Sequence, residues 1–480
     1  MIYLVPEISL TEQIINKFFQ TFGPERIAII HSQIKKEEKL YYWKKIRDKK
    51  IDIIVGARSA VFAPVRDLGL IIVDEESDPS YKSNSTPRYN ARQVAFIRAQ
   101  KEKALMLMGT ATPSIETFYF AKKGNFHLFE LKSRYNKKPL PEFNVIDLSM
   151  DEGFSKKVPI SETLIRQINQ ALSQKQQVIL FLNRRGFSHF VFCRNCGFFY
   201  TCPHCNVSLR YHKGDKLICH WCGYTRKAGK TCEQCGQDYL VHGGAGTQKI
   251  ESVIARVFPK YHISRLDTDA VRKKGKLKEI ISQFESGDIH LLTGTQMLSK
   301  GHNFPDVTLV GILFIDELLN FPDFRNTENA FQLIVQVAGR AGRDKWPGQV
   351  YIQTFLPDHY AIKYAVNYDF LSFYKTELGL RKDLNFPPFC RLIKLTLEGK
   401  HEETVQNRAG EIYQKLKSFD TDAQLLGPIP SPLYRVKGKY RFQILIKTTS
   451  PASIKERIRH LNFMDRDVHL IIDVDPYSLL

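Results

Sequence analysis

Long runs of apolar residues are missing from this chain of 480 residues. The run at 307–314 is among the longest, yet it lies between Asp306 and Asp316 and is far shorter than the roughly 20 residues that span a bilayer. A stretch with the pattern of a secretory signal is missing as well. We therefore expect no membrane-spanning segment, and a reducing, cytoplasmic environment in which thiols stay free of disulfides.

Acidic residues are scarce relative to basic ones, since 50 Asp and Glu face 70 Lys and Arg and leave a formal net charge of +20. Such an excess favours a polyanionic partner, most often nucleic acid. Lysine enrichment also follows from AT-rich codon usage, and runs such as Lys35-Lys36 or Lys273-Lys274 fit solvated faces. Charge alone therefore indicates a nucleic-acid partner only weakly.

Apolar residues are plentiful, at 43% of the chain, and the length corresponds to about three domains of average size. Short β-branched runs alternate with longer helical stretches, which is typical of a parallel sheet covered by helices. The fold class that we predict is α/β.

Eight of the nine cysteines form four Cys-x-x-Cys pairs in one window, at about 190–240. The pairs are Cys193/Cys196, Cys202/Cys205, Cys219/Cys222 and Cys232/Cys235. Two such pairs complete the tetrahedral sulfur cage that a structural zinc ion prefers, so the four pairs predict two zinc ions per chain. The alternative, a disulfide cluster, is disfavoured in a reducing compartment.

Several details of these sites stay open at the level of sequence. His204, His212 and His220 could each replace a cysteine, and spacing alone does not decide which pairs share an ion. Glycines at 197, 223 and 236 directly follow a second cysteine, where a positive φ would point backbone amides at sulfur. The window has few apolar residues, so we expect metal binding itself to fold it.

The first third of the chain predicts strands that each end in a polar motif. We expect a strand at 1–6, a helix from about Thr11 to Phe19, and buried central strands at 51–55, 70–73 and 105–108. Ligands bind at the carboxyl ends of such parallel strands. The motifs found there are Gly56–Ala60, Asp74–Ser77 and Gly109–Pro113.

The Asp74-Glu75 pair has the composition that nucleotide hydrolysis needs, because one carboxylate can bind magnesium and the next can activate water. An acidic pair after a strand is often only a solvated turn. The Thr-Ala-Thr-Pro segment at 110–113 favours the catalytic interpretation, since in two-lobed motor ATPases such a segment links nucleotide state to DNA contact.

A second α/β unit is predicted from about Pro159 onward. A strand at 177–182 leads into the basic turn Asn183–Gly186, for which a simple surface loop is the alternative. The cysteine window follows, and the α/β pattern resumes at Gly246–Gln248. A strand at 289–292 then ends in Thr293–Gln296, with Lys300 and Gly301 close behind as candidate nucleotide-binding residues.

Two arginines end a predicted helix in the segment Gln332–Arg343. A guanidinium stays protonated and can hold two phosphate oxygens at once, so Arg340 and Arg343, with Gln336, are candidates for stabilising a departing γ-phosphate. A basic helix terminus is the alternative, which the Gln-x-x-Gly-Arg-x-Gly-Arg spacing disfavours.

Together these motifs resemble one family along essentially the whole chain: the bacterial PriA, or primosomal protein N′, family of replication-restart helicases in helicase superfamily 2. The matching segments also include Leu4–Thr11, Phe181–Gly186, Pro322–Arg325 and Asp473–Pro476. The resemblance implies two RecA-like helicase lobes with parallel sheets, the first incomplete, at 1–157 and 158–368. It places a two-zinc insertion in the second lobe and a C-terminal α+β DNA-binding domain at 369–480.

The resemblance also implies an activity, cofactors and partners. The activity is 3′-5′ translocation on forked and single-stranded DNA at abandoned forks, and the cofactors are ATP and Mg²⁺. The partners are primosome proteins, a single-stranded DNA-binding protein and a helicase loader, near the nucleoid. In that family the zinc sites are nested. Zinc 1 would take Cys193, Cys196, Cys232 and Cys235, and zinc 2 would take Cys202, Cys205, Cys219 and Cys222.

The C-terminal segment interleaves aromatic and basic residues, a composition suited to base stacking and phosphate contact. A solvated strand pair is an equally good interpretation. The residues are Tyr434, Arg435, Lys437, Lys439, Tyr440 and Arg441.

Two departures from the family pattern bear on activity. Ser77 replaces the histidine of an Asp-Glu-Glu-His motif, and a Gly-x-x-x-x-Gly-Lys-Ser/Thr phosphate loop occurs nowhere in the sequence. The family places that loop just before the strand at 1–6. We therefore interpret the chain as the downstream part of a helicase. We expect exposed neighbours around Leu4 and little or no ATPase activity from the chain as written.

Two interpretations of function from different classes follow. In the first, the chain belongs to an ATP-dependent DNA helicase whose complete form carries the phosphate loop. In the second, it is a zinc-containing DNA-binding or primosome-scaffold protein without motor activity. The presence of Asp74, Glu75 and the two arginines favours the first, since a scaffold does not need them.

Overall fold

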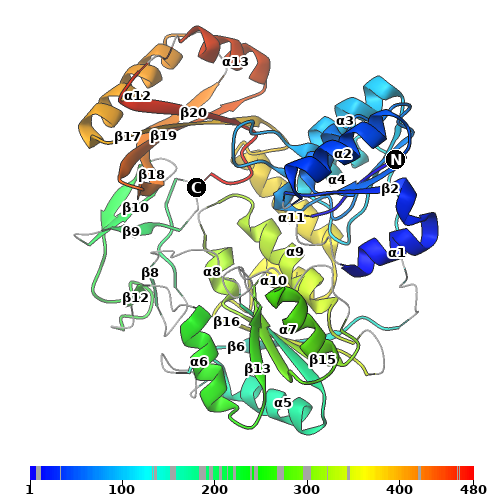
Figure 1. Cartoon of the computed structure of the whole chain (residues 1–480). Helices are drawn as coiled ribbons and strands as arrows, with labels where there is room; N and C mark the ends of the chain where they lie inside the picture. The colour runs from blue at the N-terminus through cyan, green and yellow to red at the C-terminus, as the bar shows by residue number, and fades with distance from the viewer. Residues whose placement is uncertain are drawn as a thin grey trace. The chain divides into compact units, whose positions relative to one another are not determined.

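A computed structural model shows two compact units, one formed by Met1–Asn125 and the other by most of the chain from Phe126 onward (Figure 1). The described residues are 1–6, 12–32, 34–131, 133, 138–151, 158–182, 191–193, 198–204, 208–212, 215–219, 223–237, 240–242, 247–266, 275–295, 304–321, 323–342, 346–419, 423–461, 463 and 465–479. Within these ranges, every helix is too short or too polar to span a bilayer.

The first unit is built on a parallel five-stranded sheet in the order β2-β3-β1-β4-β5. Its strands are β1 (Ile2–Leu4), β2 (Ile27–Ile30), β3 (Ile53–Gly56), β4 (Leu70–Val73) and β5 (Leu105–Met108). Its helices are α1 (Glu12–Phe22), α2 (Lys36–Arg47), α3 (Ala91–Glu102) and α4 (Ile115–Lys122), with short 3-10 turns η1 (Pro24–Arg26), η2 (Arg58–Phe62) and η3 (Pro79–Tyr81). The strands and the helix predicted from the sequence are confirmed, with ends shifted by a few residues.

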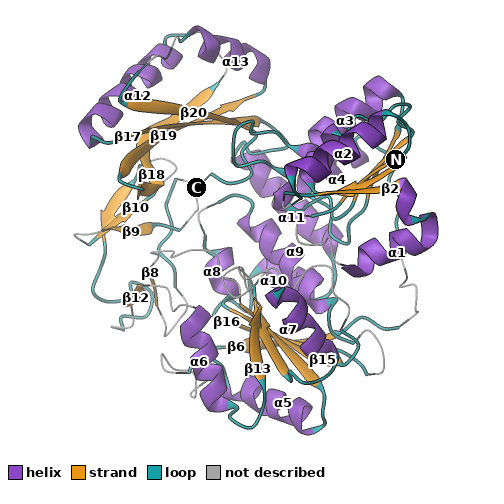
Figure 2. Ribbon diagram, in the orientation of Figure 1, coloured by secondary structure: helices purple, strands orange, loops and turns teal. Residues whose placement is uncertain are grey.

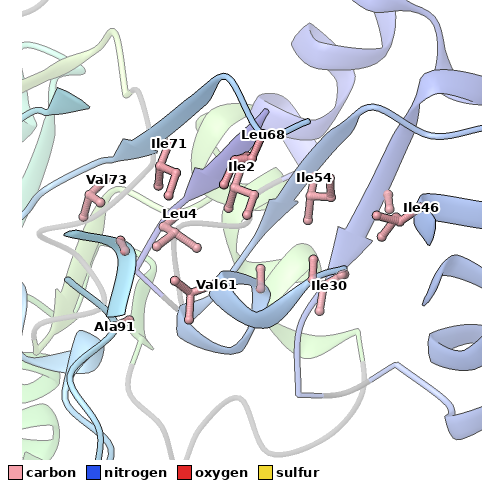
Figure 3. Close-up of a cluster of buried hydrophobic side chains, with 14 of the residues drawn as sticks. Ile2, Leu4, Ile30, Ile46, Ile54, Val61, Leu68, Ile71, Val73 and Ala91 are labelled. Atoms are coloured by element: carbon pink, nitrogen blue, oxygen red, sulfur yellow. The ribbon is translucent and has the colours of Figure 1, made fainter. Parts of the chain in front are cut away.

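Apolar side chains from neighbouring strands meet on one face of this sheet and form its core. Ile2 lies in register between Ile54 and Ile71, and all three are fully buried. Figure 3 shows these side chains close together, with Val61 of η2 beside Leu4. Burial of β-branched residues on this face explains why such short runs form strands.

Two expectations for this sheet are wrong. Leu105 and Leu107 of β5 are 63% and 47% exposed, so this strand is an edge and not a buried central strand. Leu4 and its neighbours on β3 and β4 are buried, not exposed, because β1 has a strand on each side. An apolar run predicts a strand but cannot reveal whether the strand has one neighbour or two.

Side-chain caps fix where several helices begin. The Asn90 side chain accepts a hydrogen bond from Arg92 N at the start of α3, and Ser114 accepts one from Thr117 N at the start of α4. Ser161 does the same for Leu164 N at the start of α5 (Glu162–Ser173). The cap at Ser114 matters for the site, because it orients a helix that begins directly after the Thr-Ala-Thr-Pro segment.

The second unit contains a parallel six-stranded sheet in the order β13-β14-β7-β15-β16-β6. These strands are β6 (Glu142–Asp147), β7 (Gln177–Leu182), β13 (Ile263–Leu266), β14 (Leu291–Gly294), β15 (Val307–Leu313) and β16 (Gln349–Thr354). The helices of this part are α5, α6 (Thr247–Val257), α7 (Lys276–Glu285), α8 (Ile315–Leu319), α9 (Asn326–Ala338), α10 (Tyr360–Val366) and α11 (Phe370–Asp383).

The division between the units differs from the boundary expected at residue 157. β6 pairs with β16 over six residues, from Glu142 opposite Gln349 to Asp147 opposite Thr354. It therefore belongs to the second sheet, as its edge strand. The sequence predicted the unit from about Pro159 with the strand at 177–182 as its first, and β6 precedes both.

The cysteine window folds as two small antiparallel sheets in the described residues of 191–242, which we call the cysteine module (Figure 2). One sheet has the order β11-β10-β9 and the other pairs β12 with β8. The strands are β8 (Val191–Cys193), β9 (Arg210–His212), β10 (Lys216–Ile218), β11 (Thr225–Lys227) and β12 (Leu240–His242).

The C-terminal domain is an antiparallel sheet in the order β18-β19-β17-β20, with two helices packed on one face. Its elements are β17 (Arg391–Gly399), α12 (Glu402–Lys417), β18 (Gln424–Val436), β19 (Lys439–Thr448), α13 (Pro451–His460) and β20 (Val468–Val474). This arrangement confirms the predicted α+β domain.

The cysteine module and the C-terminal domain share a buried apolar cluster. The module contributes Val191, Tyr200, Cys202, Leu209, Leu217 and Cys219, and the domain contributes Phe386, Cys390, Leu392, Leu445 and Leu479. The apolar core that the window lacks on its own is thus completed by residues far along the chain. This contact was not predicted from sequence patterns.

A buried ion network joins α9 to α11. The guanidinium of Arg381 donates to Glu328 Oε2 at 2.6 Å and to Glu377 Oε1 at 2.9 Å, and all three side chains are at most 5% exposed. Tyr360 of α10 donates to Glu377 Oε2 at 2.7 Å. Buried charges are tolerated when they are paired in this way, and removal of one partner leaves the others desolvated and unpaired.

Arg381→Met should therefore lower the free energy of unfolding by about 3–5 kcal/mol, because Glu328 and Glu377 would stay buried without their cation. Urea unfolding followed by near-UV circular dichroism measures this loss. Lys363→Ala is a suitable control, because Lys363 pairs with Asp358 at an exposed position where ion pairs contribute little. Equal losses in the two variants would contradict the assigned role of the network.

Candidate functional site

The three predicted motifs of the first unit meet at the carboxyl edge of its sheet. Val5 N donates to Gly56 O at 3.0 Å, Asp74 N donates to Leu4 O at 2.9 Å, and Gly109 N donates to Val73 O at 2.9 Å. Neighbouring strands β3, β1, β4 and β5 therefore end side by side. This is the edge at which parallel sheets bind ligands.

The carboxylate of Asp74 is held in one orientation. Its Oδ2 accepts a hydrogen bond from the Tyr3 hydroxyl at 3.0 Å, and its Oδ1 accepts one from Glu75 N at 3.0 Å. Burial, followed by the charge of Asp74, raises the pKa of Tyr3 well above its usual value, so this hydroxyl remains a donor. The Tyr81 hydroxyl donates to Asp74 O and fixes the backbone as well.

Glu75 has a left-handed backbone, with φ of 45°. A non-glycine residue rarely adopts this conformation, and such strain is concentrated at functional sites. Here it turns the chain sharply after β4, so that the acidic pair lies at the rim of the sheet, where both side chains are half-buried. An oriented carboxylate beside a second carboxylate is suited to holding Mg²⁺ and polarising water.

Glu76 connects the acidic turn to the residues on either side of the Thr-Ala-Thr-Pro segment, and sequence reasoning did not single it out for this. Its side chain is 1% exposed and forms an ion pair with Arg92 of α3. Its Oε1 accepts from Ser114 N at 2.7 Å, and its Oε2 accepts from Thr117 Oγ1 at 3.0 Å. One buried carboxylate therefore ties the end of β4 to the start of α4.

The backbone reinforces this link, because Glu76 N donates to Gly109 O at 3.1 Å. Ser77, which replaces the histidine expected in the motif, is 5% exposed and lies directly after this carboxylate. Glu76 thus ties the acidic motif to Gly109, Ser114 and Thr117. Coupling of nucleotide state to DNA contact through this segment stays a prediction.

In the second unit, Gln336 and Arg340 lie one turn apart near the end of α9, and both are half-buried. Gly342, with φ of 63°, then turns the chain against the backbone of Gly348. A Cβ at Gly342 would lie 2.3 Å from Gly348 N, so only glycine fits there. This close approach explains the second glycine of the Gly-Arg-x-Gly-Arg motif.

Other predicted residues of this lobe lie outside the described part of the chain. These are the basic turn Asn183–Gly186, the segment from Gln296 through Lys300 and Gly301, and Arg343. Their assignment to nucleotide binding stays a prediction.

Three of the cysteines predicted to share zinc 1 lie together. The Sγ atoms of Cys193, Cys232 and Cys235 are within 4.8 Å of one another, and Cys193 Sγ is 3.6 Å from Cys235 Sγ. Tetrahedral coordination with Zn–S bonds of about 2.3 Å places sulfur atoms about 3.8 Å apart. The cluster therefore fits a zinc ion, and the sulfurs are too far apart for a disulfide.

The backbone around the cysteines has the expected form. Gly236 has φ of 73° and donates to Cys232 O at 2.9 Å, and Gly223 has φ of 79° and donates to Cys219 O at 3.0 Å. Both glycines predicted to have positive φ in this part of the structure are confirmed.

Cys202 and Cys219 of the predicted zinc 2 set are buried in the cluster shared with the C-terminal domain. Cys196, Cys205 and Cys222 lie outside the described residues, as do Gly197 and His220.

The ninth cysteine is different in character. Cys390 donates to Asn385 O at 3.1 Å, and burial raises the pKa of its thiol to about 11. A thiol that stays protonated is a poor metal ligand, since zinc binds the thiolate. The Cys390 side chain therefore contributes to the packing of the buried cluster and is not a candidate metal ligand.

The aromatic and basic residues near 434–441 lie on a strand pair, β18 and β19, joined by a turn at Lys437 and Gly438 with positive φ. Glu398 accepts from Lys439 at 3.1 Å and from Arg441 at 2.8 Å, and the Arg435 guanidinium lies over the Tyr440 ring. Part of the basic charge is thus neutralised within the domain. DNA contact by these residues stays a prediction.

Four protein-family models match separate segments of the chain. The DEAD/DEAH box helicase model matches residues 1–119 and the helicase conserved C-terminal domain matches 244–345. The PriA DNA helicase Cys-rich region domain matches 202–227, and the primosomal protein N C-terminal domain matches 382–477. These matches confirm two helicase lobes with a cysteine-rich insertion and a family-specific C-terminal domain.

Relatives match over the whole chain. The replication restart protein PriA of Bacillus subtilis is 39% identical over all of this chain and 60% of its own length. The PriA proteins of Treponema pallidum and Rickettsia felis are 39% and 37% identical, over 73% and 74% of their lengths. Among solved structures, Saccharomyces cerevisiae Dbp5 bound to RNA and ADP BeF3 matches 80% of this chain and 81% of that one, at 14% identity and a TM-score of 0.42.

The chain spans about 60% of the length of the Bacillus subtilis relative. Sequence identity of this extent, with a cysteine-rich model and a C-terminal model that are specific to one family, assigns the chain without ambiguity. The protein belongs to the PriA family of replication restart proteins.

Proposed function

We propose that the chain is part of an ATP-dependent DNA helicase that moves 3′ to 5′, recognises stalled or abandoned replication forks and initiates primosome assembly. The single observation that carries the motor assignment is the buried Glu76 network, which joins the acidic turn to Ser114 and Thr117, directly after the Thr-Ala-Thr-Pro segment. A structural turn has no need of a buried carboxylate that bridges two motifs, since burying that charge is costly.

In this proposal each described residue has a physical role. ATP with Mg²⁺ supplies the phosphoryl group and the counter-charge. Asp74, oriented by Tyr3 and Glu75 N, would hold the metal, and Glu75 would orient the attacking water. Arg340, with Gln336 four residues earlier, would stabilise the charge that develops on the γ-phosphate. Lys300, Gly301 and Arg343 complete the nucleotide site by resemblance.

Glu76 acts as the link between hydrolysis and DNA. A change at the Asp74-Glu75 turn is transmitted through Glu76 to Ser114 and Thr117, and hence to the beginning of α4. The backbone bond from Glu76 N to Gly109 O makes the connection stiff.

Zinc completes the cysteine module, with nested ligand sets. The proximity of Cys193 to Cys232 and Cys235 supports the pairing of the first Cys-x-x-Cys with the fourth. The second and third pairs remain for the other ion, which brings Cys202 and Cys219 together with Cys205 and Cys222.

The proposed partners are forked and single-stranded DNA and the proteins of the primosome, including a single-stranded DNA-binding protein and a helicase loader. The net charge of +20 supports the nucleic-acid partner. A zinc-containing scaffold without motor activity is the competing function, and the core shared by the cysteine module and the C-terminal domain is the observation that favours it.

Arg340→Ala separates these two functions. In a form of the protein that carries a phosphate loop, ATP hydrolysis and fork unwinding should fall about 10³-fold or more, because an arginine finger contributes on that order to the rate. Binding to forked DNA, measured by fluorescence anisotropy at fixed salt, should stay nearly unchanged. Arg256→Ala, at an exposed position of α6, is the matched control. Unwinding that survives Arg340→Ala would favour the scaffold.

Zinc content tests the metal assignment in the 480-residue chain itself. Native mass spectrometry should find two zinc ions per chain, and Cys232→Ser should leave one, because it removes a ligand from the cluster with Cys193 and Cys235. Cys390→Ser should keep both, since this buried thiol bonds to Asn385 O. A folded wild-type protein without zinc would refute the assignment.

A further inference from the structure

The segment Asp475–Leu479 follows β20 and stays attached to β17 of the C-terminal domain. We call this segment the C-terminal tail. Asp475 N donates to Leu392 O at 2.8 Å, and Lys394 Nζ donates to Ser478 O at 3.0 Å. The middle of the tail lies between these two attachments, so its place is set by the C-terminal sheet.

The tail also contacts the beginning of α9 in the helicase lobe. The Tyr477 hydroxyl donates to Asn329 Oδ1, on α9, at 2.8 Å. The Arg325 guanidinium, directly before α9, donates to the carbonyl oxygen of the residue before Tyr477 at 3.3 Å and lies over the Tyr477 ring. The buried carboxylate of Asp323 accepts from Leu479 N at 2.8 Å. Several polar contacts therefore join the first turns of α9 to the tail.

A pair of stacked aromatic rings forms a second contact at the same place. Phe324 stacks on Phe386, with ring centroids 4.7 Å apart and an angle of 10° between the ring planes. Lys447 of β19 lies over the Phe386 ring, with Nζ 3.7 Å from its centroid, and donates to Leu384 O at 2.8 Å. Because Phe324 directly precedes Arg325, the C-terminal sheet holds this part of the chain through the rings as well as through the tail.

Helix α9 can transmit the position of its first turns to its end. Its sequence, Asn326–Ala338, contains neither proline nor glycine, the residues at which helices most often bend, and most of its side chains are buried. Gln336 lies about 10 Å beyond Asn329 along the helix axis, at about 1.5 Å per residue. Arg340 follows the helix directly, and its backbone N donates to Val337 O at 3.0 Å.

We propose that the C-terminal domain positions Arg340 through α9, with Tyr477 and Phe324 as the positioning residues. A shift of the C-terminal sheet moves the tail and Phe386, and α9 follows as a rigid body that carries Arg340 with it. A displacement of about 1 Å is enough to weaken a group that must meet a transition state. A contact that only joined the domains would stabilise the fold without setting the rate of hydrolysis. The inference rests on the proposed role of Arg340, which Arg340→Ala tests separately.

Hydrogen exchange in the 480-residue chain tests the mechanical link. Gly342 N, just beyond the end of α9, donates to Val307 O at 3.0 Å, so this amide is protected while the end of the helix stays in place. Tyr477→Phe removes only the hydroxyl bond to Asn329, and the Gly342 amide should then exchange about threefold faster or more. Tyr351→Phe, which removes a hydroxyl bond within β16, is the matched control.

Steady-state ATP hydrolysis with single-stranded DNA, in a form of the protein that carries a phosphate loop, tests the positioning role. Tyr477→Phe should lower kcat about fivefold and leave the KM for ATP unchanged, because ATP still binds while the arginine finger is displaced. In an Arg340→Ala background the same substitution should leave kcat unchanged, because its effect passes through Arg340. Phe324→Leu, which removes the stacking on Phe386, should show the same dependence on Arg340.

Unchanged exchange at Gly342 in both Tyr477→Phe and Phe324→Leu would overturn the positioning role. So would equal fractional losses of kcat in the two backgrounds, which is the result expected of a contact that only stabilises the fold. A normal kcat for Arg340→Ala alone would refute the proposed function, and the inference with it.

Discussion

A buried carboxylate must find hydrogen-bond donors or a cation, and in the first unit Glu76 finds them in two other segments of the chain. This requirement couples the acidic turn after β4 to the residues after β5. The parallel sheet makes the coupling possible, because strands that run in one direction deliver their carboxyl ends to one edge. At this edge, the Tyr3 hydroxyl donates to the Asp74 carboxylate and the Tyr81 hydroxyl donates to the Asp74 carbonyl oxygen.

The second unit depends on the same constraint in another form. Arg381 is buried, and Glu328 of α9 and Glu377 of α11 compensate its charge. Asp323 is buried just before the same helix and accepts hydrogen bonds from Ser478 and Leu479 N. Buried ionic or polar contacts therefore hold the chain at the beginning of α9, while Gln336 near its end and Arg340 just beyond it are half-buried.

Sequence patterns predicted the features that depend on local chemistry. Strands, the acidic pair, the cysteine pairs and the glycines with positive φ follow from residue type and spacing, and so does the α/β class. Features that depend on distant partners were missed. β5 proved to be an edge, β6 pairs in the second sheet, and Leu479 belongs to the same buried cluster as Cys202, because a local run of residues reveals neither sheet order nor long-range burial. The linking role of Glu76 could have been suspected, because a third acidic residue after a strand needs a cation or hydrogen-bond donors from elsewhere in the chain.

The most direct measurement of the central claim, that Glu76 couples nucleotide chemistry to DNA movement, is the number of base pairs unwound per ATP hydrolysed. It requires a form of the protein with a phosphate loop, compared with its Glu76→Gln variant. Glutamine keeps the size of the side chain but removes the negative charge that pairs with Arg92, and only one of the two oxygens that accept from Ser114 N and Thr117 Oγ1 remains an acceptor. The account predicts that this ratio falls several-fold while the KM for ATP changes little. An unchanged ratio, with hydrolysis and unwinding lowered equally or not at all, would contradict it.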